Sequence, residues 1–286
     1  MTSAIPRVLS IGGTDPTGGA GIQADLKSIA AHGGYGMAVV TALLAQNTRG
    51  VRSIHTPPAD FLRDQLAAVS DDVTIDAVKV GMLGNAEIVE AVDGWLARVR
   101  PPLVVLDPVM IASSGDRLLE PGTETAIRGL LQRVDLVTPN LLELGALLGE
   151  DTATNWAQAI EQGRRLSVAS HIIVLVKGGH LEGKECPDAL VDVAGRLPGG
   201  RQFIEVTGER VDTANTHGTG CSMSSALATL HARLGDWSAA LAETKAWMQE
   251  SLHHADELDV GTGPGPIHHF HRLWSADQRA PRRATT

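Results

Sequence analysis

Short apolar runs that alternate with helical segments constrain the fold of this chain most strongly. The runs at residues 8–11, 37–44, 77–80, 103–106, 136–139 and 172–176 have the length and composition of buried strands. Helix-like segments at residues 22–31, 59–70, 86–98, 140–148 and 156–166 lie between them. Helices between successive strands are typical of a parallel sheet that is covered on both faces. We therefore predict an α/β fold with a three-layer, doubly wound, mostly parallel sheet.

The alternation changes between residues 186 and 206. Two short strand candidates, 189–193 and 202–206, are joined by Gly195 and by the turn residues Pro198, Gly199 and Gly200. This pattern predicts an antiparallel addition at one edge of the sheet. Long helices are expected at residues 222–234 and 238–254. No linker composition interrupts the chain, so we expect one domain over residues 1–275 and a disordered tail at 276–286.

Composition excludes several classes of function. A net charge of -9 and a pI near 5.6 argue against a nucleic-acid surface, and the basic cluster Arg279, Arg282 and Arg283 is assigned to the tail. No apolar run reaches the ~18 residues of a spanning helix, and the first residues lack the core of a signal peptide. Cys186 and Cys221 form no disulfide framework. We expect a cytoplasmic protein without a membrane or nucleic-acid partner.

The stretch at residues 216–221 is the strongest candidate for a binding element. Gly218 and Gly220 allow a tight turn, and the small residues behind them predict a helix that begins there. The free amides and the dipole of such a helix N-terminus favour a phosphate or a phosphoryl group in transit. Cys221 lies at this anion seat, where the same field would favour its thiolate. A simple tight loop and a small buried cysteine remain the alternative.

Polar residues follow several of the predicted strands. Gln46, Asp107 and Lys177 stand at strand carboxyl ends, where ligand groups collect in open α/β sheets. The glycine-rich loop at residues 12–21 has neither the Walker A nor the dinucleotide spacing, and Asp25 lies about one helical turn beyond it. Each residue also has a structural interpretation, as a turn cap or as an acid that favours a helix dipole. Asn140 and Glu143 fit either a shared site or a capping box.

The shared position of these polar residues at strand carboxyl ends predicts that they line one cleft and take part in one reaction. An anion seat, a lysine and separated acids suit phosphoryl transfer, which depends on positioning and charge neutralisation. The sequence does not predict a metal site at the C-terminal histidines, because they lie in a polar, Gly/Pro-broken region without ordered spacing; these are His253, His254, His268, His269 and His271. The residues expected to share the cleft are Asp25, Gln46, Met82, Asp107, Glu143, Lys177 and Cys221.

Seven motifs in order resemble one known family. The segments 18–27, 45–50, 79–83, 107–110, 138–143, 177–180 and 215–221 resemble the hydroxymethylpyrimidine and phosphomethylpyrimidine kinases of thiamine synthesis, which are ribokinase-like. Departures from the family pattern are small. Gly13 and Thr14 stand where the family usually has an Ala-Gly-Ser segment, and Thr17 stands where a serine is common. Most ribokinase relatives carry aspartate where Cys221 stands, and the pyrimidine kinases carry cysteine. The resemblance implies that MgATP phosphorylates a hydroxymethylpyrimidine and then its monophosphate, and it suggests a homodimer.

The resemblance also implies roles for individual positions. The substrate would be held by Asp25 and Gln46, in a pocket lined by Met82, Val109 and Gly13. Mg²⁺ would be organised by Asp107 and Glu143. The ATP phosphates would be bound by Lys177, Asn140, Thr213 and Thr216. The anion hole would be formed by Gly218, Thr219 and Gly220, with Cys221 as the catalytic base.

Two other functions are compatible with the sequence. A pyridoxal or pyridoxine kinase has the same fold and a similar ring as substrate, and Met82 discriminates, because pyridoxal-type relatives often carry histidine there. The second alternative is a binding protein that kept the fold and lost the chemistry. The presence of Asp107, Glu143, Lys177 and Cys221 argues against it. No second catalytic domain is expected after Leu273, so a fused thiaminase-like or thiamine phosphate synthase activity is not expected.

Overall fold

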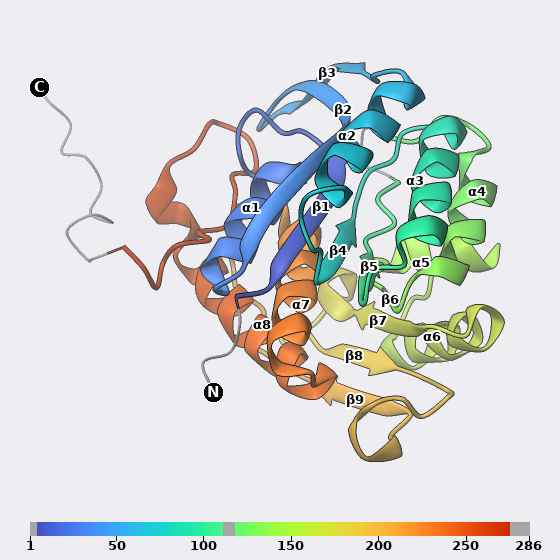
Figure 1. The fold of residues 1–286 in the computed structure, drawn as a ribbon. Helices are drawn as coiled ribbons and strands as arrows, with labels where there is room; N and C mark the ends of the chain where they lie inside the picture. The colour runs from blue at the N-terminus through green and yellow to red at the C-terminus, as the bar shows by residue number, and fades with distance from the viewer. Residues whose placement is uncertain (1–4, 111–117, 275–286) are drawn as a thin grey trace, which may run out of the picture.

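The computed structural model describes residues 5–110 and 118–274. In this part of the chain nine strands form one sheet, in the order β3-β2-β1-β4-β5-β6-β7-β8-β9 (Figure 1). The parallel strands are β2 (Tyr35–Asn47), β1 (Arg7–Gly13), β4 (Ala77–Val80), β5 (Val104–Leu106), β6 (Leu136–Val137) and β7 (Ile173–Lys177). Antiparallel strands close both edges: β3 (Gly50–His55), and β8 (Asp188–Val191) with β9 (Phe203–Val206).

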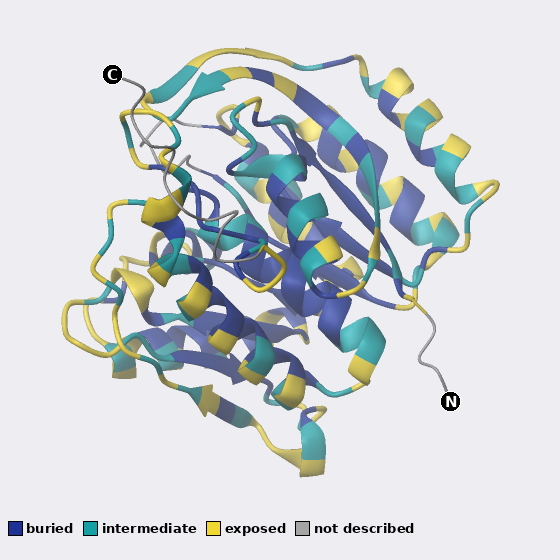
Figure 2. Ribbon diagram, turned by 90° about the vertical axis from the view of Figure 1, so that its left-hand side faces the viewer, coloured by how far each residue is buried: buried dark blue, intermediate teal, exposed yellow. Residues whose placement is uncertain are grey.

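Helices cover both faces of this sheet. One layer contains α1 (Gly21–Ala31), α7 (Thr219–Leu234) and α8 (Trp237–His253). The other contains α2 (Ala59–Ser70), α3 (Ala86–Val99), α4 (Thr123–Leu130), α5 (Leu141–Leu148) and α6 (Trp156–Ser170). The strands and the inner helix faces are buried, whereas the outer helix faces are exposed (Figure 2). The predicted fold class is therefore confirmed, including the antiparallel edge of β8 and β9.

Side-chain caps explain where several helices begin. Asn85 accepts a hydrogen bond from the Ile88 amide at the start of α3, and Asn155 accepts one from Gln158 at the start of α6. Each cap satisfies an amide that has no partner within the helix. Local signals of this kind fix the start of α3 and α6. The helix expected at 59–70, which has no side-chain cap, and the strand expected at 77–80 also have the predicted bounds.

Two elements differ from the sequence-based expectation. The polar stretch after Leu44 was expected to end its strand, but β2 continues to Asn47 and pairs with β3 in an antiparallel hairpin. The hairpin lies at the sheet edge and faces solvent in part, so its residues do not form an apolar run. Helix α4 was not predicted, because it is short and starts at a left-handed glycine, Gly122, with φ of 87°.

The C-terminal histidines also differ from the expectation of a polar region. His268, His269 and His271 are buried, and His271 Nε2 lies 2.9 Å from Glu250 Oε2. Over residues 5–110 and 118–274, no group of three or more His, Cys, Asp or Glu side chains is placed to hold a metal ion. Within the same residues, no helix has the length and apolarity that a membrane crossing requires. The expected tail, 276–286, lies outside the described residues.

Candidate active site

A cavity of about 690 Å³ lies at the carboxyl ends of the parallel strands. Its volume falls in the range of small-molecule sites, and its place is the usual ligand position in open α/β sheets. Of the sequence-predicted site residues, Thr213 does not line it, and its hydroxyl instead donates to Asp256 Oδ1 at 2.8 Å. The predicted residues that do line it are Gly13, Asp25, Gln46, Met82, Asp107, Val109, Asn140, Glu143, Lys177, Thr216, Gly218, Thr219, Gly220 and Cys221.

One end of the cavity is apolar. Met82 and Leu44 belong to a small buried cluster, separate from the two main cores, against which Val109 packs. Gly13 keeps this end open, because a Cβ at that position would lie 3.0 Å from Met82 Sδ and 3.3 Å from Leu44 Cδ1. Gln46 adds a polar amide beside these apolar side chains. Such a surface suits a flat ring that carries a few polar atoms.

The middle of the cavity is bordered by the N-terminus of α7. Gly218 caps the helix with φ of 79°, and a Cβ there would lie 1.8 Å from the Gly19 carbonyl oxygen. A side chain at residue 218 would therefore push apart the loop that contains Gly19 and the loop that contains Gly218. The amides of the first turn of α7 have no intrahelical acceptor, and they lie at the positive end of the helix dipole. This N-terminus has the geometry of the anion seat that the sequence predicted.

Charged side chains from two strands converge on this seat. Asp107 directly follows β5 and Lys177 ends β7, with Lys177 Nζ 3.8 Å from Asp107 Oδ1. A Cβ on Gly220 would lie 3.6 Å from Asp107 Oδ2 and 3.8 Å from Lys177 Nζ, so glycine leaves room between them. Thr138 Oγ1 donates to Asp107 Oδ1 at 3.1 Å and fixes the carboxylate. Positive and negative side chains thus face one volume next to the N-terminus of α7, where the Thr219 amide donates to the Thr216 carbonyl oxygen at 3.3 Å.

The sequence left two interpretations of Glu143 open, a helix cap and a site residue. Glu143 forms a capping box, in which the Asn140 amide donates to Glu143 Oε2 at 2.8 Å and the Glu143 amide donates to Asn140 Oδ1 at 2.9 Å. The same side chain borders the cavity near Asp107. Burial, together with the nearby Asp107 charge, raises the pKa of Glu143 to about 7. Two carboxylates that border the same cavity form a donor set that suits Mg²⁺.

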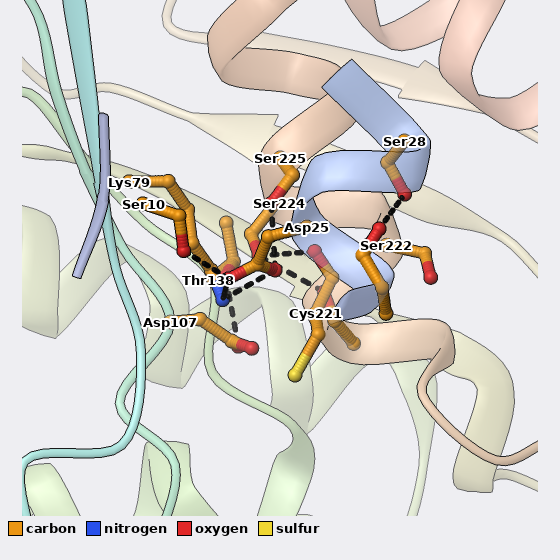
Figure 3. A network of polar contacts seen from close by, with 12 residues as sticks. Ser10, Asp25, Ser28, Lys79, Asp107, Thr138, Cys221, Ser222, Ser224 and Ser225 are labelled. Carbon is orange, nitrogen blue, oxygen red and sulfur yellow. Dashed lines mark hydrogen bonds and ion pairs between the residues drawn. The ribbon is translucent and has the colours of Figure 1, made fainter. Parts of the chain in front are cut away.

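A buried polar network lies next to the first turn of α7 (Figure 3). Asp25 accepts hydrogen bonds from Ser10 Oγ at 2.6 Å and from Ser225 Oγ at 2.8 Å. Lys79 Nζ lies 2.9 Å and 3.0 Å from its two carboxylate oxygens. Burial disfavours the charged form of Lys79, but the carboxylate of Asp25 holds the pKa of Lys79 above its usual value. Asp25 therefore borders the cavity with both oxygens already bonded to protein groups.

The expectation of a stabilised Cys221 thiolate is wrong for this structure. Burial raises the pKa of Cys221 to about 12, and the negative charges of Asp25 and Asp107 act in the same direction. Lys79 and a hydrogen bond from the Gly21 amide work against this rise without cancelling it. The helix field that sequence reasoning relied on is outweighed by desolvation and by two carboxylates from other elements.

Sequence reasoning missed several residues of the cavity. Lys79 interrupts an otherwise apolar strand, and this interruption was a readable signal. His217 and Asp15 lie in glycine-containing loops but had no role assigned, although their side chains meet at 2.8 Å. Residues of α8 carried no signal, because a cavity-lining helix face has the same apolar pattern as a core face. At the end of the cavity toward α8, the missed residues include His180, Glu209, Arg210, Met248, Gln249 and Leu252.

Comparison with known proteins gives matches along most of the chain. Residues 15–268 match the family described as phosphomethylpyrimidine kinase. The hydroxymethylpyrimidine/phosphomethylpyrimidine kinase of Escherichia coli K12 is 49% identical over 267 residues, which are 93% of this chain and 98% of that protein. The thiamine biosynthesis multifunctional protein ThiED of Corynebacterium glutamicum is 55% identical over 279 residues. The match covers 96% of this chain but only 36% of that protein, so this chain spans about a third of it.

Solved structures give the same fold. The pyridoxal kinase of Staphylococcus aureus in complex with ADP superposes with a TM-score of 0.82 at 27% identity, covering 94% of this chain and 96% of that one. A phosphomethylpyrimidine kinase from Clostridium difficile 630 superposes with a TM-score of 0.73 at 32% identity, covering 86% and 99%. The predicted ribokinase-like fold is therefore confirmed.

Proposed function

The chain belongs to the phosphomethylpyrimidine kinase family, and from this premise we propose that it uses ATP to phosphorylate 4-amino-5-hydroxymethyl-2-methylpyrimidine. It then phosphorylates the monophosphate to the diphosphate, for thiamine biosynthesis. One observation carries the proposal: a single cavity joins an apolar ring-sized end to an anion seat flanked by Lys177, Asp107 and Glu143. This arrangement suits an acceptor and a phosphoryl donor bound side by side.

In the proposed complex, the pyrimidine lies against Met82 and Val109 with Gln46 at its polar edge. Its hydroxymethyl oxygen then points to the N-terminus of α7. Phosphoryl transfer spreads negative charge over the oxygens of the moving group. The amides of the first turn of α7 and the ammonium of Lys177 stabilise that charge without having to reorganise.

Asp107 and Glu143 would hold Mg²⁺, which neutralises phosphate charge and orients the oxygens. The fit is supported by the raised pKa of Glu143, because a carboxylate that is buried close to another gains from a nearby cation. Cys221 remains the proposed proton acceptor. In a loose transition state the attacking hydroxyl loses its proton late, so this step contributes less than the stabilisation of charge at the seat.

The nucleotide would occupy the far end of the cavity, toward α8. Met248 and Leu252 give this end an apolar wall, and Gln249 and Arg210 give it polar groups. The proposal is supported by the Staphylococcus aureus pyridoxal kinase structures, which were solved with ADP and with AMP-PCP. Asn140 and Thr216 would contact the phosphates between the two ends. The proposed location of the enzyme is the cytoplasm.

A homodimer is part of the proposal. The sheet edge formed by β2 and β3 exposes Tyr35, Leu43 and Ile54, which are 61%, 49% and 39% exposed. Large apolar side chains on an edge hairpin are a common feature of protein interfaces. Light scattering of the purified chain would test this, and a monomeric mass at micromolar concentration would contradict it.

A side activity on pyridoxal or pyridoxine is the second candidate. It is favoured by the superposition on a pyridoxal kinase over nearly the whole chain. The apolar surroundings of Met82 favour the pyrimidine as the main substrate.

A coupled ADP-release assay decides between the two. The pyrimidine alcohol, its monophosphate and pyridoxine are compared at saturating MgATP. We expect kcat/KM to be at least about tenfold higher for the pyrimidines, which corresponds to ~1.4 kcal/mol of discrimination. Turnover of pyridoxine with no ADP release from either pyrimidine would overturn the proposal.

A further inference from the structure

His217 contacts three other segments of the chain. It directly precedes Gly218 at the anion seat, and its ring packs on Gly19, where a Cβ would lie 2.6 Å from His217 Cδ2. Its backbone amide donates to the Gly265 carbonyl oxygen at 3.0 Å. The ring is buried and borders the cavity. These contacts leave the imidazole little freedom to turn.

The ring nitrogen Nε2 of His217 faces two side chains. It lies 2.8 Å from Asp15 Oδ2 and 3.3 Å from the amide nitrogen Nε2 of Gln46. Asp15 is held in place by the amide of Thr17 and by the amide of Ala20, which donate to its carboxylate at 2.9 Å and 2.8 Å. Although burial opposes ionisation, hydrogen bonds from His217 and Thr17 lower the pKa of Asp15 to about 2.

An ionised Asp15 fixes the proton on the imidazole. A carboxylate only accepts hydrogen bonds, so Nε2 of His217 must carry a hydrogen and donate it. The Gln46 atom nearest to Nε2 must then also be an acceptor, because two N–H donors cannot bond to each other. The oxygen and nitrogen of a glutamine amide exchange by a half-turn, and the hydrogen-bond network decides between the two orientations. The structure has Gln46 Nε2 at this contact, and a half-turn of the amide would bring the Gln46 oxygen to His217 and turn the NH₂ group toward a ligand in the cavity.

We propose that His217 is a positioning residue that orients the Gln46 amide through this shared contact, so that the substrate ring meets an N–H donor. The inference deepens the proposed function and rests on it. A pyrimidine offers ring nitrogens as acceptors, and one of them would receive the Gln46 NH₂ group. His217 would thereby link recognition of the ring to the loop that forms the anion seat, since both depend on the same residue and its neighbour Gly218.

A double-mutant cycle tests the inference. His217→Phe keeps an aromatic ring and removes the donor, and Gln46→Ala removes the group that His217 would orient. We expect His217→Phe to raise the dissociation constant of the pyrimidine alcohol about tenfold in calorimetry without nucleotide, because one positioned hydrogen bond is lost. In the Gln46→Ala background the same change should have less than about a twofold effect, since nothing remains to be oriented. His217→Gln retains a donor and should bind within about threefold of the parent.

The matched control is His231→Phe, which alters a half-buried imidazole that stacks on Trp237 at 3.8 Å, away from the cavity. It should leave pyrimidine binding unchanged. Equal effects of His217→Phe with and without Gln46 would overturn the inference, as would an equal rise in the KM for ATP. If His217→Phe does not fold, the cycle is run with His217→Gln and Asp15→Asn, and failure of Asp15→Asn to weaken binding would also overturn it. A parent protein that binds no pyrimidine would instead overturn the proposed function.

Discussion

Lys79 and Asp25 form an ion pair with 2.9 Å between Nζ and Oδ1, and each side chain is 1% exposed. Lys79 lies within β4, where the neighbouring strand residues are apolar and buried. The pair lies close to Cys221 in the first turn of α7 (Figure 3). Two serine hydroxyls complete the bonding of the Asp25 carboxylate. The floor of the cavity is thus a fully bonded polar network, which is costly to break from one side.

Lys79→Met should destabilise the protein by about 3–5 kcal/mol, because it leaves the Asp25 carboxylate buried without its cation. Adding Asp25→Asn should recover part of this loss by removing the unpaired charge. Urea unfolding of the parent, the single variant and the double variant measures both effects.

The control for this prediction is the exposed pair of Arg63 and Asp60, whose side chains are 52% and 93% exposed. Arg63→Met should change stability by less than about 0.5 kcal/mol, because solvent screens such pairs. A similarly small change in stability for Lys79→Met would contradict the prediction, because it would mean that the stability of the protein does not depend on the charge of Lys79.

Glu143→Gln should stabilise the protein at pH 8 and impair catalysis. The folded pKa of about 7 lies above the ordinary 4.5, so the Glu143 contribution to stability is present below pH 4.5 and is lost as the pH rises to 7. Glutamine keeps the acceptor for the Asn140 amide and avoids the buried charge. We expect roughly 1–3 kcal/mol of added stability at pH 8 and almost none near pH 4.5. Urea unfolding at both pH values, without nucleotide or Mg²⁺, measures the difference.

The same variant should lose more than about tenfold in turnover at limiting Mg²⁺, because one of the two proposed carboxylate ligands is neutral. Parallel stability curves for the parent and Glu143→Gln between pH 4.5 and pH 8 would contradict the raised pKa. An unchanged dependence on Mg²⁺ would remove Glu143 from the metal site.

The sequence could predict those parts of the fold that rest on local patterns. The buried strand at Ala77–Val80 and the helix at Ala59–Ser70 have one dominant periodicity each, and both were placed correctly. The β2 and β3 hairpin was missed because an edge strand has mixed exposure. The polar positions at strand ends were also readable, since the topology brings all such ends to one side of the sheet.

The electrostatics of the candidate site could not be read in the same way. The pKa of Cys221 depends on burial and on Asp25 and Asp107, which lie far away in the sequence. The contact of His217 with Asp15 joins residues 202 positions apart. Such contacts form only when the loops pack together, so no local sequence pattern predicts them.

Gln46→Ala should raise the KM for the pyrimidine alcohol about 10- to 100-fold and leave the KM for ATP nearly unchanged. A site that hydrogen-bonds the ring loses ~1–3 kcal/mol when one partner is removed. Steady-state kinetics with each substrate varied in turn gives both constants. Equal effects on the two KM values would place Gln46 outside the ring end of the cavity.

Met82→His should shift the preference toward pyridoxine, because it places a polar ring among the apolar side chains that include Leu44 and Val109. The ratio of kcat/KM for the pyrimidine alcohol to that for pyridoxine measures the shift. The conservative Met82→Leu serves as the control and should keep the preference of the parent. A ratio that does not move in Met82→His would show that this position does not select the ring.

Cys221→Ala should change the pH profile of turnover. With the thiol pKa near 12, the thiolate fraction rises about tenfold per pH unit through the neutral range, so a thiolate base predicts that kcat of the parent rises without a plateau to pH 9. Cys221→Ala should lose this slope and roughly 10²-fold or more in kcat, and Cys221→Asp should restore part of it. An alanine variant within about threefold of the parent, with the same profile, would leave the α7 amides and Lys177 as the catalytic groups.

The most direct test of the central claim follows the phosphoryl group itself. Phosphorus NMR of the purified protein with MgATP and the pyrimidine alcohol reports both the donor and the product. We predict that the γ-phosphate signal of ATP decreases while a pyrimidine monophosphate signal appears and is then replaced by that of the diphosphate. Lys177→Met should slow the first step by at least about 10²-fold, because the charge of the moving group loses its cation. A γ-phosphate signal that persists, or that reappears only as inorganic phosphate, would contradict the account.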